Sequence, residues 1–412
     1  MEKSLSKSAR TRTLFLIYLR QTSAALIIYQ PIFIPFLLHR GMDMIDIALL
    51  QTAYNLGVLL LDIPTGYVAD RWGRKWALAA TNLSLAVGTA LICLGHTLST
   101  FMIAELFYAL AIALDSGTHS AYLFEWLRRE KLEANYYRYD ALGTFIYLIT
   151  STAGTLVAGF YAEKDLMIPV AATIALTFIG FPVACLLPSQ KTIETPGGQP
   201  EPRIVLSDIL AIVGETLKTP GVRWAVGVTV IWFWARQYVN LIISQPYFMS
   251  INLHFSDFGI LYSILTFGSG LIAFFSRRFM KLPDLRPLTA MGLVLIPVSF
   301  AIMGLTNGQR GLAGFFLFAV PYGLCTAITN TLLNRQYSRH ESRATFLSIV
   351  DTCVRLVASI LALGLGWVLA HYGPARALQV AMLLSSVMAL FLMPGLFRFG
   401  TQTPEAKGSP IL

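Results

Sequence analysis

The chain has 412 residues, of which 55% are hydrophobic and 13% charged, and its formal net charge is +9. Soluble domains carry about 25% charged residues, so this composition excludes an ordinary soluble protein and indicates a chain that lies in a lipid bilayer. In a membrane protein, the distribution of Lys and Arg among the loops explains the positive charge without a nucleic acid partner.

Hydrophobic runs long enough to cross a bilayer recur along the sequence, since about 20 apolar residues of helix span ~30 Å. Solid apolar runs favour helices over a β-barrel, whose strands would alternate polar and apolar residues. We therefore predict an all-α integral membrane protein with twelve transmembrane helices. The predicted spans, numbered in chain order, are 13–38, 45–68, 76–95, 98–125, 139–162, 166–187, 224–249, 257–276, 287–306, 311–334, 344–370 and 375–397.

The positions of Lys and Arg predict the orientation of these spans, because positive residues in short loops stay in the cytoplasm. The N-terminus, the even-numbered loops and the C-terminus hold 24 of the 31 Lys and Arg residues. The opposite side holds four, namely Arg40, Lys164, Arg310 and Arg376. We predict a multi-pass protein of the cell inner (plasma) membrane with both termini cytoplasmic. The first span is too long for a signal peptide and no small-residue cleavage site follows it, so we expect it to be retained as a helix.

One long polar segment, 188–223, divides the spans into six and six. It begins Pro- and Gly-rich, and "LSDILAIVGETLKTPG" then predicts a short amphipathic helix with Ser207 as its N-cap and a Pro-Gly stop. We predict an N-terminal six-helix bundle over 1–187, a cytoplasmic linker over 188–223 and a C-terminal six-helix bundle over 224–412.

The two halves repeat a short pattern. "RQTSAALIIYQPIF" (20–33) lies in the first span and "RQYVNLIISQPYF" (236–248) in the seventh, and "DIALLQTAYNLG" (46–57) aligns with "DFGILYSILTFG" (257–268). Two pseudo-symmetric bundles of this kind are typical of transporters that rock around a central site. Each Gln-Pro pair also predicts a kink about four residues earlier, because proline removes a backbone N–H and frees a carbonyl.

Polar and charged residues inside the spans are the candidates for a working site, because a charge costs at least about 2.5 kcal/mol at mid-bilayer unless it faces a cavity or a partner. The candidates for substrate binding are Arg20, Gln30, Arg236, Asn240, Gln245, Tyr247 and Arg355. Those for proton coupling are Asp115, Glu105, Asp351 and His119.

Helical spacing relates some of these candidates to one another. Asp351 and Arg355 form an i,i+4 pair, either structural or coupling. Asp115 and His119 are predicted one turn apart in the fourth span, with His119 either a packing histidine or a proton carrier. We prefer Asp115 to Glu105 as the protonatable group, because it lies deeper in that span.

The loop after the second span reads "GYVADRWGRKWAL" (66–78). It resembles the loop signature of the major facilitator superfamily, G-x-L-A-D-R-x-G-R-K-x-x-L, with Val68 in place of Leu. The resemblance implies a cytoplasmic latch in which Asp70 meets the start of the eleventh span. Arg71, Arg74 and Lys75 would hold neighbouring loop groups, while Gly66 and Gly73 would permit close helix approach and a tight turn.

No P-loop, HExxH or GxSxG motif is present, and the four cysteines form no CxxC pair, so we predict neither an enzyme nor a metal site nor a cofactor. Without a nucleotide-binding module, transport must be driven by a gradient. The chain is most similar to bacterial drug-efflux members of the family, although an Arg beside Gly117 and a Gly-Pro-Gly-Gly ending to the fifth span are missing. We predict a monomeric, proton-coupled secondary transporter that exports a small organic solute. The alternatives are proton-coupled uptake of an organic anion, and a receptor or scaffold that does not transport.

Overall fold

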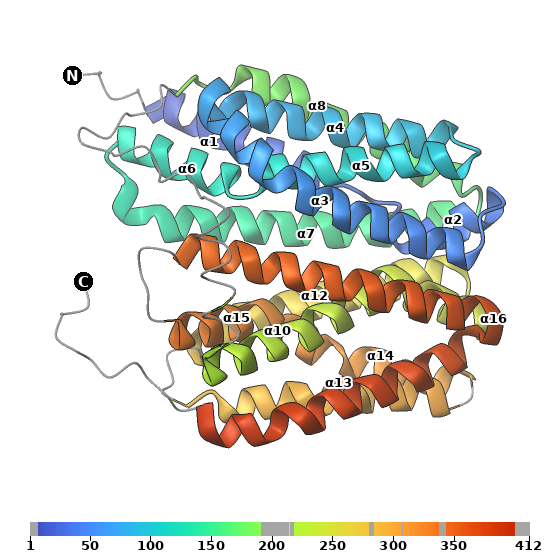
Figure 1. The fold of residues 1–412 in the computed structure, drawn as a ribbon. Coiled ribbons are helices and arrows are strands. Elements are labelled where there is room, and N and C mark those ends of the chain that lie inside the picture. Colours follow the sequence, from blue (N-terminus) through green and yellow to red (C-terminus); the bar gives the residue numbers. More distant parts are fainter. Residues whose placement is uncertain are drawn as a thin grey trace. The chain divides into compact units, whose positions relative to one another are not determined.

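The computed structural model describes residues 7–190, 214, 218–279, 284–306, 308–337 and 343–399, without the side chains of 7, 63, 70, 277–279 and 343–345. The described elements are all helical, as predicted (Figure 1). Two sequence predictions lie outside the described part of the chain: almost all of the amphipathic linker helix, and the side chain of Asp70.

The chain forms two compact units, and each is described by itself. The first comprises Met1–Pro196 with Asn252–Phe267, and the second comprises Gly197–Ile251 with Gly268–Leu412. The first half of one helix, α12 (Phe255–Phe279), therefore packs with the first unit. The division at 1–187, 188–223 and 224–412 stays a prediction.

Long helices joined by short turns build the first unit. Its helices are α1 (Lys7–Ala25), η1 (Gln30–Ile32), α2 (Phe33–His39), α3 (Met44–Trp72), α4 (Arg74–Leu94), α5 (Leu98–Asp115), α6 (Thr118–Arg129), η2 (Glu133–Asn135), α7 (Tyr136–Ala162) and α8 (Met167–Leu186). Asp43 begins α3 with a capping box, because its carboxylate accepts from the N–H groups of Ile45 and Asp46.

The second unit has the same helical character. Its helices are α10 (Pro220–Tyr238), the π-helix η3 (Val239–Ile243), α11 (Ser244–Ser250), the second half of α12, α13 (Arg286–Leu305), η4 (Gly308–Gly311), α14 (Leu312–Leu317), α15 (Ala319–Gln336) and α16 (Arg343–Phe399). Trp232 anchors its core, since the indole N–H donates to the Pro321 carbonyl at 2.7 Å. A Cβ built on Gly292 would lie 2.1 Å from the Trp232 ring, so only glycine fits beside it.

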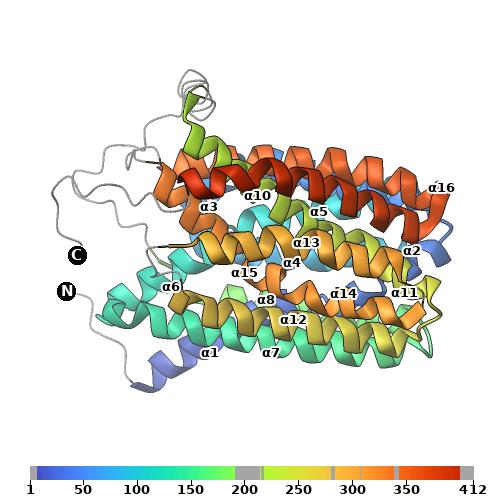
Figure 2. The ribbon, with the colours of Figure 1, turned by 90° about the horizontal axis from the view of Figure 1, so that it is seen from below.

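The described residues contain eleven helices long and apolar enough to cross a membrane, one fewer than predicted. The difference lies in α16, whose 57 residues include Gly373 with φ 76 and ψ 174, a backbone conformation that no helix contains. Figures 1 and 2 show α16 as two lengths that double back on each other. These lengths correspond to the predicted eleventh and twelfth spans, and counting them separately gives twelve candidate spans among the described residues.

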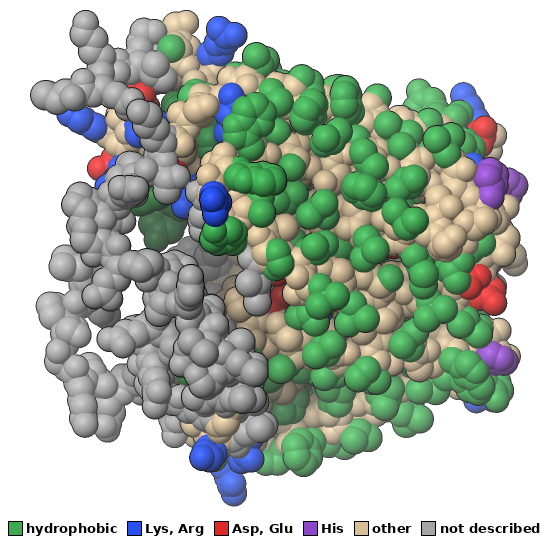
Figure 3. Space-filling view, turned by 45° about the horizontal axis from the view of Figure 1, so that its top comes forward, with side chains coloured by type: hydrophobic (Ala, Val, Ile, Leu, Met, Phe, Trp, Pro, Cys, Tyr) green, Lys and Arg blue, Asp and Glu red, His purple; other side chains and the backbone are tan. Residues whose placement is uncertain are grey.

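Hydrophobic side chains cover the flanks of the helices, as Figure 3 shows. On α16, for example, Phe391 is 86% exposed and Leu390 72% exposed. An apolar exterior of this extent is stable only against lipid, which agrees with a multi-pass membrane protein.

Within the first unit, α7 and the first half of α12 touch backbone to backbone. A Cβ built on Gly159 would lie 2.8 Å from the Gly259 Cα, and one built on Gly259 would lie 2.9 Å from the Gly159 Cα. Near the same end of α7, Glu163 accepts a hydrogen bond from the Ser256 backbone N–H at 2.9 Å. Two glycines that face each other are what permit this close approach.

Candidate functional site

Four predicted spans are not continuous α-helices. The first breaks between α1 and η1, the fourth between α5 and α6, the seventh at the π-helix η3 and the tenth between α14 and α15. Irregular backbone at membrane depth occurs where it is buried in protein or lines a polar cavity. Most of the predicted substrate-binding and proton-coupling residues lie on three of these spans, the first and the fourth in the first unit and the seventh in the second unit.

The two breaks predicted from Gln-Pro are confirmed. Residues 26–29 interrupt the first span just before Pro31, and η3 ends three residues before Pro246. The breaks in the fourth and tenth spans were not predicted. The fourth span breaks at Gly117, whose φ of 70 lies in the left-handed region. In the tenth span the residue that could have indicated the break is Pro321, near the start of α15.

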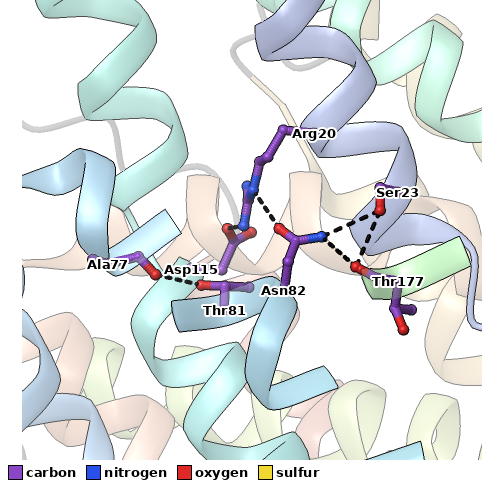
Figure 4. A network of polar contacts seen from close by, with 7 residues as sticks. All are labelled: Arg20, Ser23, Ala77, Thr81, Asn82, Asp115 and Thr177. Atoms are coloured by element: carbon purple, nitrogen blue, oxygen red, sulfur yellow. Dashed lines mark hydrogen bonds and ion pairs between the residues drawn. The ribbon is translucent and has the colours of Figure 1, made fainter. Parts of the chain in front are cut away.

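An ion pair inside the first unit joins two of the predicted site residues. Arg20 on α1 donates through Nη2 to the Asp115 carboxylate at 2.5 Å. The Arg20 side chain is 1% exposed and the Asp115 side chain is 36% exposed, so Asp115 is the accessible member. Figure 4 shows the guanidinium between Asp115 and Asn82.

Asn82 on α4 connects this ion pair to α8. Its side-chain oxygen accepts from Arg20 Nε at 2.9 Å, and its amide donates to the Thr177 carbonyl at 3.2 Å and to Ser23 Oγ at 3.4 Å. Ser23 in turn donates to the Leu176 carbonyl at 2.5 Å. Four helices thus hold one buried arginine, which offsets the cost of its burial. Sequence reasoning missed Asn82; a single Asn inside the apolar run of the third span was its signal.

We predicted that His119 lies one turn from Asp115 on the same helix, and this prediction is wrong. Asp115 is the last residue of α5, and His119 is the second residue of α6, beyond the break at Ser116 and Gly117. His119 is half-buried and within electrostatic reach of both Arg20 and Asp115. Its Nδ1 atom is buried and has no hydrogen-bond partner among the described residues.

Glu105 lies on α5, half-buried, and no ion pair or hydrogen bond joins its side chain to another described residue. One turn along α5, Tyr108 belongs to a buried chain of hydroxyl groups. Tyr29 donates to Tyr108 at 2.8 Å, and the hydroxyls of Tyr108 and Thr89 are 2.5 Å apart. The structure therefore separates the two carboxyl candidates of the fourth span: Asp115 has a cationic partner and Glu105 does not.

In the second unit, two arginines share one aromatic ring. The guanidinium carbons of Arg236 on α10 and Arg355 on α16 each lie 5.6 Å from the centroid of Phe233. Arg236 also lies 5.8 Å from the Tyr322 ring. The predicted i,i+4 pair is confirmed, because Arg355 Nε donates to Asp351 at 2.6 Å. The second unit thus gathers two predicted binding arginines at one aromatic ring.

The remaining binding candidates differ in burial. Gln30 and Asn240 are half-buried at the two Gln-Pro breaks. Gln245 is 1% exposed and Tyr247 is 3% exposed, and the Tyr247 hydroxyl donates to the Gly308 carbonyl at 3.3 Å. Gln245 and Tyr247 are therefore buried in the interior of the second unit.

The loop between α3 and α4 contains the predicted latch residues. Gly73 has φ 95, so the predicted tight turn is confirmed. Arg71 donates to the Tyr67 hydroxyl at 2.9 Å, Arg74 forms an ion pair with Glu125, and Lys75 lies over the Trp76 ring. A Cβ built on Gly66 would meet no described atom within 4 Å.

The described residues contain no group of His, Cys, Asp and Glu side chains placed to hold a metal ion.

Comparison with known proteins gives consistent results. The Major Facilitator Superfamily sequence model matches residues 15–362. The chain is 23% identical over 280 residues to YxaM of Bacillus subtilis (strain 168), an uncharacterised MFS-type transporter. The aligned region covers 65% of this chain and 68% of that protein.

Solved structures share the fold at low sequence identity. The nucleoside transporter NupG is 15% identical with a TM-score of 0.75, over 94% of this chain and 98% of that one. The peptide transporter POT is 14% identical with a TM-score of 0.71, over 95% of this chain and 96% of that one. At such identity the likeness extends to the fold alone.

Proposed function

The chain belongs to the major facilitator superfamily, and from that premise we propose that the Arg20–Asp115 ion pair couples the passage of a small organic solute to protons. As a member of this family it is a membrane-embedded secondary transporter of small solutes and not an enzyme. The coupling ion, the solute class and the direction are the proposed parts.

The observation that carries the proposal is the 2.5 Å contact between a fully buried guanidinium and a partly accessible carboxylate inside predicted spans. Arginine keeps its charge under all ordinary conditions, whereas a carboxylate can take up a proton. Protonation of Asp115 removes the attraction to Arg20, and deprotonation restores it. Such a pair has two states that a proton selects, which a coupling site requires.

We propose export as the direction, on the resemblance of the chain to bacterial drug-efflux members of the family. Proton-coupled uptake of an organic anion is the second candidate. The observation that favours uptake is the pair of guanidinium groups in the second unit, since those of Arg236 and Arg355 each lie 5.6 Å from the Phe233 ring centroid. Two guanidinium groups around one aromatic ring suit a flat organic anion.

Replacement of the protonatable group tests the coupling. In proteoliposomes assayed with a panel of organic acids, amines and neutral solutes, Asp115→Asn is expected to abolish accumulation driven by a pH gradient. Exchange of solute across the membrane without a gradient is expected to persist, because exchange needs binding and alternating access but no net proton movement. The sign of the gradient that drives accumulation in the unmodified protein distinguishes export from uptake.

Asp351→Asn is assayed in parallel, since it removes the other carboxylate candidate that is paired with an arginine, and it is expected to keep accumulation driven by a pH gradient if Asp115 is the coupling group. Loss of both accumulation and exchange in Asp115→Asn would make Asp115 a structural or solute-binding residue. Accumulation that stays fully dependent on pH would transfer the coupling role to Glu105 or Asp351.

A further inference from the structure

The break in the fourth span leaves a helix N-terminus uncapped inside a membrane-crossing segment. Leu98–Arg129 is apolar enough to cross the membrane, yet it divides at Ser116 and Gly117. Gly117 is the N-cap of α6 and has no side chain with which to cap it. The first hydrogen bond within α6 runs from the Ala121 N–H to the Gly117 carbonyl. The backbone N–H groups of Thr118, His119 and Ser120 precede it, so they have no acceptor within the helix.

A buried cation lies beside this N-terminus. Arg20, which contacts Asp115 three positions before α6, keeps its Nη1 atom buried and without a hydrogen-bond partner among the described residues. His119, the second residue of α6, has a buried Nδ1 atom in the same condition. The helix N-terminus and the guanidinium together form a donor-rich, positively polarised site, and the imidazole adds a donor in the tautomer that carries its proton on Nδ1.

Among the described residues, Asp115 is the acidic side chain that forms an ion pair with Arg20 at this site. While it is ionised, its carboxylate occupies Arg20 Nη2 and repels a second anion. Once it takes up a proton, the repulsion disappears and Arg20 is left without its counter-charge. A buried guanidinium without a counter-charge is unstable, so it attracts another anion.

We propose that this break is the seat for an anionic oxygen group of the solute, a carboxylate or a phosphate, held by the N-terminus of α6 and by Arg20 when Asp115 is protonated. The inference rests on the proton coupling proposed for Asp115 and deepens the second candidate function, uptake of an organic anion, because it specifies the solute class. The only covalent change is a proton transfer: an aqueous hydronium ion gives its proton to an Asp115 carboxylate oxygen, and the solute anion takes the place of that carboxylate beside Arg20. A proton and an anion therefore bind together, whereas a cationic solute would compete with the proton.

Binding in detergent, without a gradient, tests the seat separately from transport. The probes are benzoate and phenyl phosphate, with benzyl alcohol as the neutral control, and the readout is the half-saturation concentration from the shift of the thermal unfolding midpoint. Asp115→Asn removes the competing carboxylate and keeps Arg20, so the preferred anion is expected to bind at least about fivefold more tightly, the usual scale of coupling between linked sites.

The matched variant is Asp115→Asn combined with Arg20→Gln, which differs from the first only in Arg20 and leaves no buried unpaired charge to prevent folding. It is expected to lose the anion-specific shift, while Arg310→Gln in a predicted loop keeps the binding of the unmodified protein. Preference for benzoate assigns the seat to a carboxylate, and preference for phenyl phosphate assigns it to a phosphate.

The seat is overturned if Asp115→Asn shows no gain in anion binding, or if the double variant binds as tightly as Asp115→Asn. Either result leaves proton coupling to be judged by the flux assay. Conversely, tight anion binding in Asp115→Asn together with unchanged pH-driven accumulation supports the seat and refutes the coupling role of Asp115.

Discussion

Arg20 shows what a charged side chain needs in order to lie inside an apolar bundle. Its Nε atom has an amide acceptor in Asn82 and its Nη2 atom has a carboxylate in Asp115. The side chain of Asn82 is itself completely buried and also satisfies the Thr177 carbonyl. Loss of the amide would therefore leave a buried donor and a buried carbonyl with fewer partners.

We predict that Asn82→Ala lowers the free energy of unfolding by about 1–3 kcal/mol, the cost of buried polar groups left without partners. Thermal or denaturant unfolding in detergent measures it. Ser84→Ala is the control, because Ser84 is a buried polar residue two positions along the same helix and forms no hydrogen bond with Arg20. Equal effects of the two substitutions would mean that the Asn82 network contributes no special stability.

The sequence identified Arg20 and Asp115 separately, because any charge within an apolar span needs a partner or a cavity. Arg20 was predicted to bind the solute, and Asp115 was predicted to carry the proton. Their pairing was not predictable, since 95 positions separate them and the contact depends on how α1 packs near the end of α5. Asn82 carries no formal charge and lies outside the repeated Arg-Gln and Gln-Pro pattern, so neither signal pointed to it.

At the scale of helices, local chemistry decides which breaks the sequence reveals. Pro31 and Pro246 remove an N–H from their helices, so the interruptions before them were predictable. The break at Gly117 depends on a left-handed φ of 70, and a glycine in an apolar span is as often a packing residue as a turn. Only the folded backbone distinguishes the two.

Because Gly117 has a left-handed backbone and Gly364 a helical one, we predict that replacement by alanine changes stability in opposite directions at these two positions. Gly117→Ala is expected to destabilise the protein by about 1–2 kcal/mol, because an L-residue is strained in the left-handed region. Gly364→Ala on α16, where a Cβ meets no described atom within 4 Å and the backbone is helical, is expected to stabilise it by about 0.5–1 kcal/mol. Unfolding midpoints in detergent compare them, and a stabilising Gly117→Ala would contradict the break.

The contact of α7 with the first half of α12 makes a further prediction. Gly159→Val places side-chain atoms where the Gly259 backbone lies, 2.8 Å from the built Cβ, so the two helices must separate. With cysteines at Glu163 and Ser256 in a background without native cysteines, a short bifunctional thiol reagent is expected to link them efficiently. Gly159→Val should reduce the yield several-fold, whereas Gly268→Val should not, because Gly268 has no described atom near it. Equal yields would refute the close approach.

For the whole molecule, composition and hydrophobic run length were enough to predict an all-helical membrane protein, and the fold agrees with that of NupG. The predicted eleventh and twelfth spans appear as the two lengths of α16, with Gly373 and Pro374 between them. The sequence alone did not show that residues 252–267 pack with the first unit. A repeat predicts two similar halves, but helix-to-helix contacts such as Gly159 with Gly259 depend on the conformation that the chain adopts.

The orientation in the membrane is the remaining prediction at this scale, and it rests on the 24 of 31 Lys and Arg residues that fall on the predicted cytoplasmic side. Single cysteines at two exposed positions test it in intact cells: His96 in the turn after α4, and Ala134 in the turn before α7. A membrane-impermeant thiol reagent is expected to label His96→Cys from outside, and Ala134→Cys only after the membrane is permeabilised.

The reverse pattern would place both termini outside and would show that loop charge does not set the topology of this chain. It would also exchange the two faces on which the latch loop and the Gly159–Gly259 contact lie. The sign of the pH gradient that drives solute movement would then have to be assigned again. For this reason the labelling experiment comes before any flux measurement that assigns export or uptake.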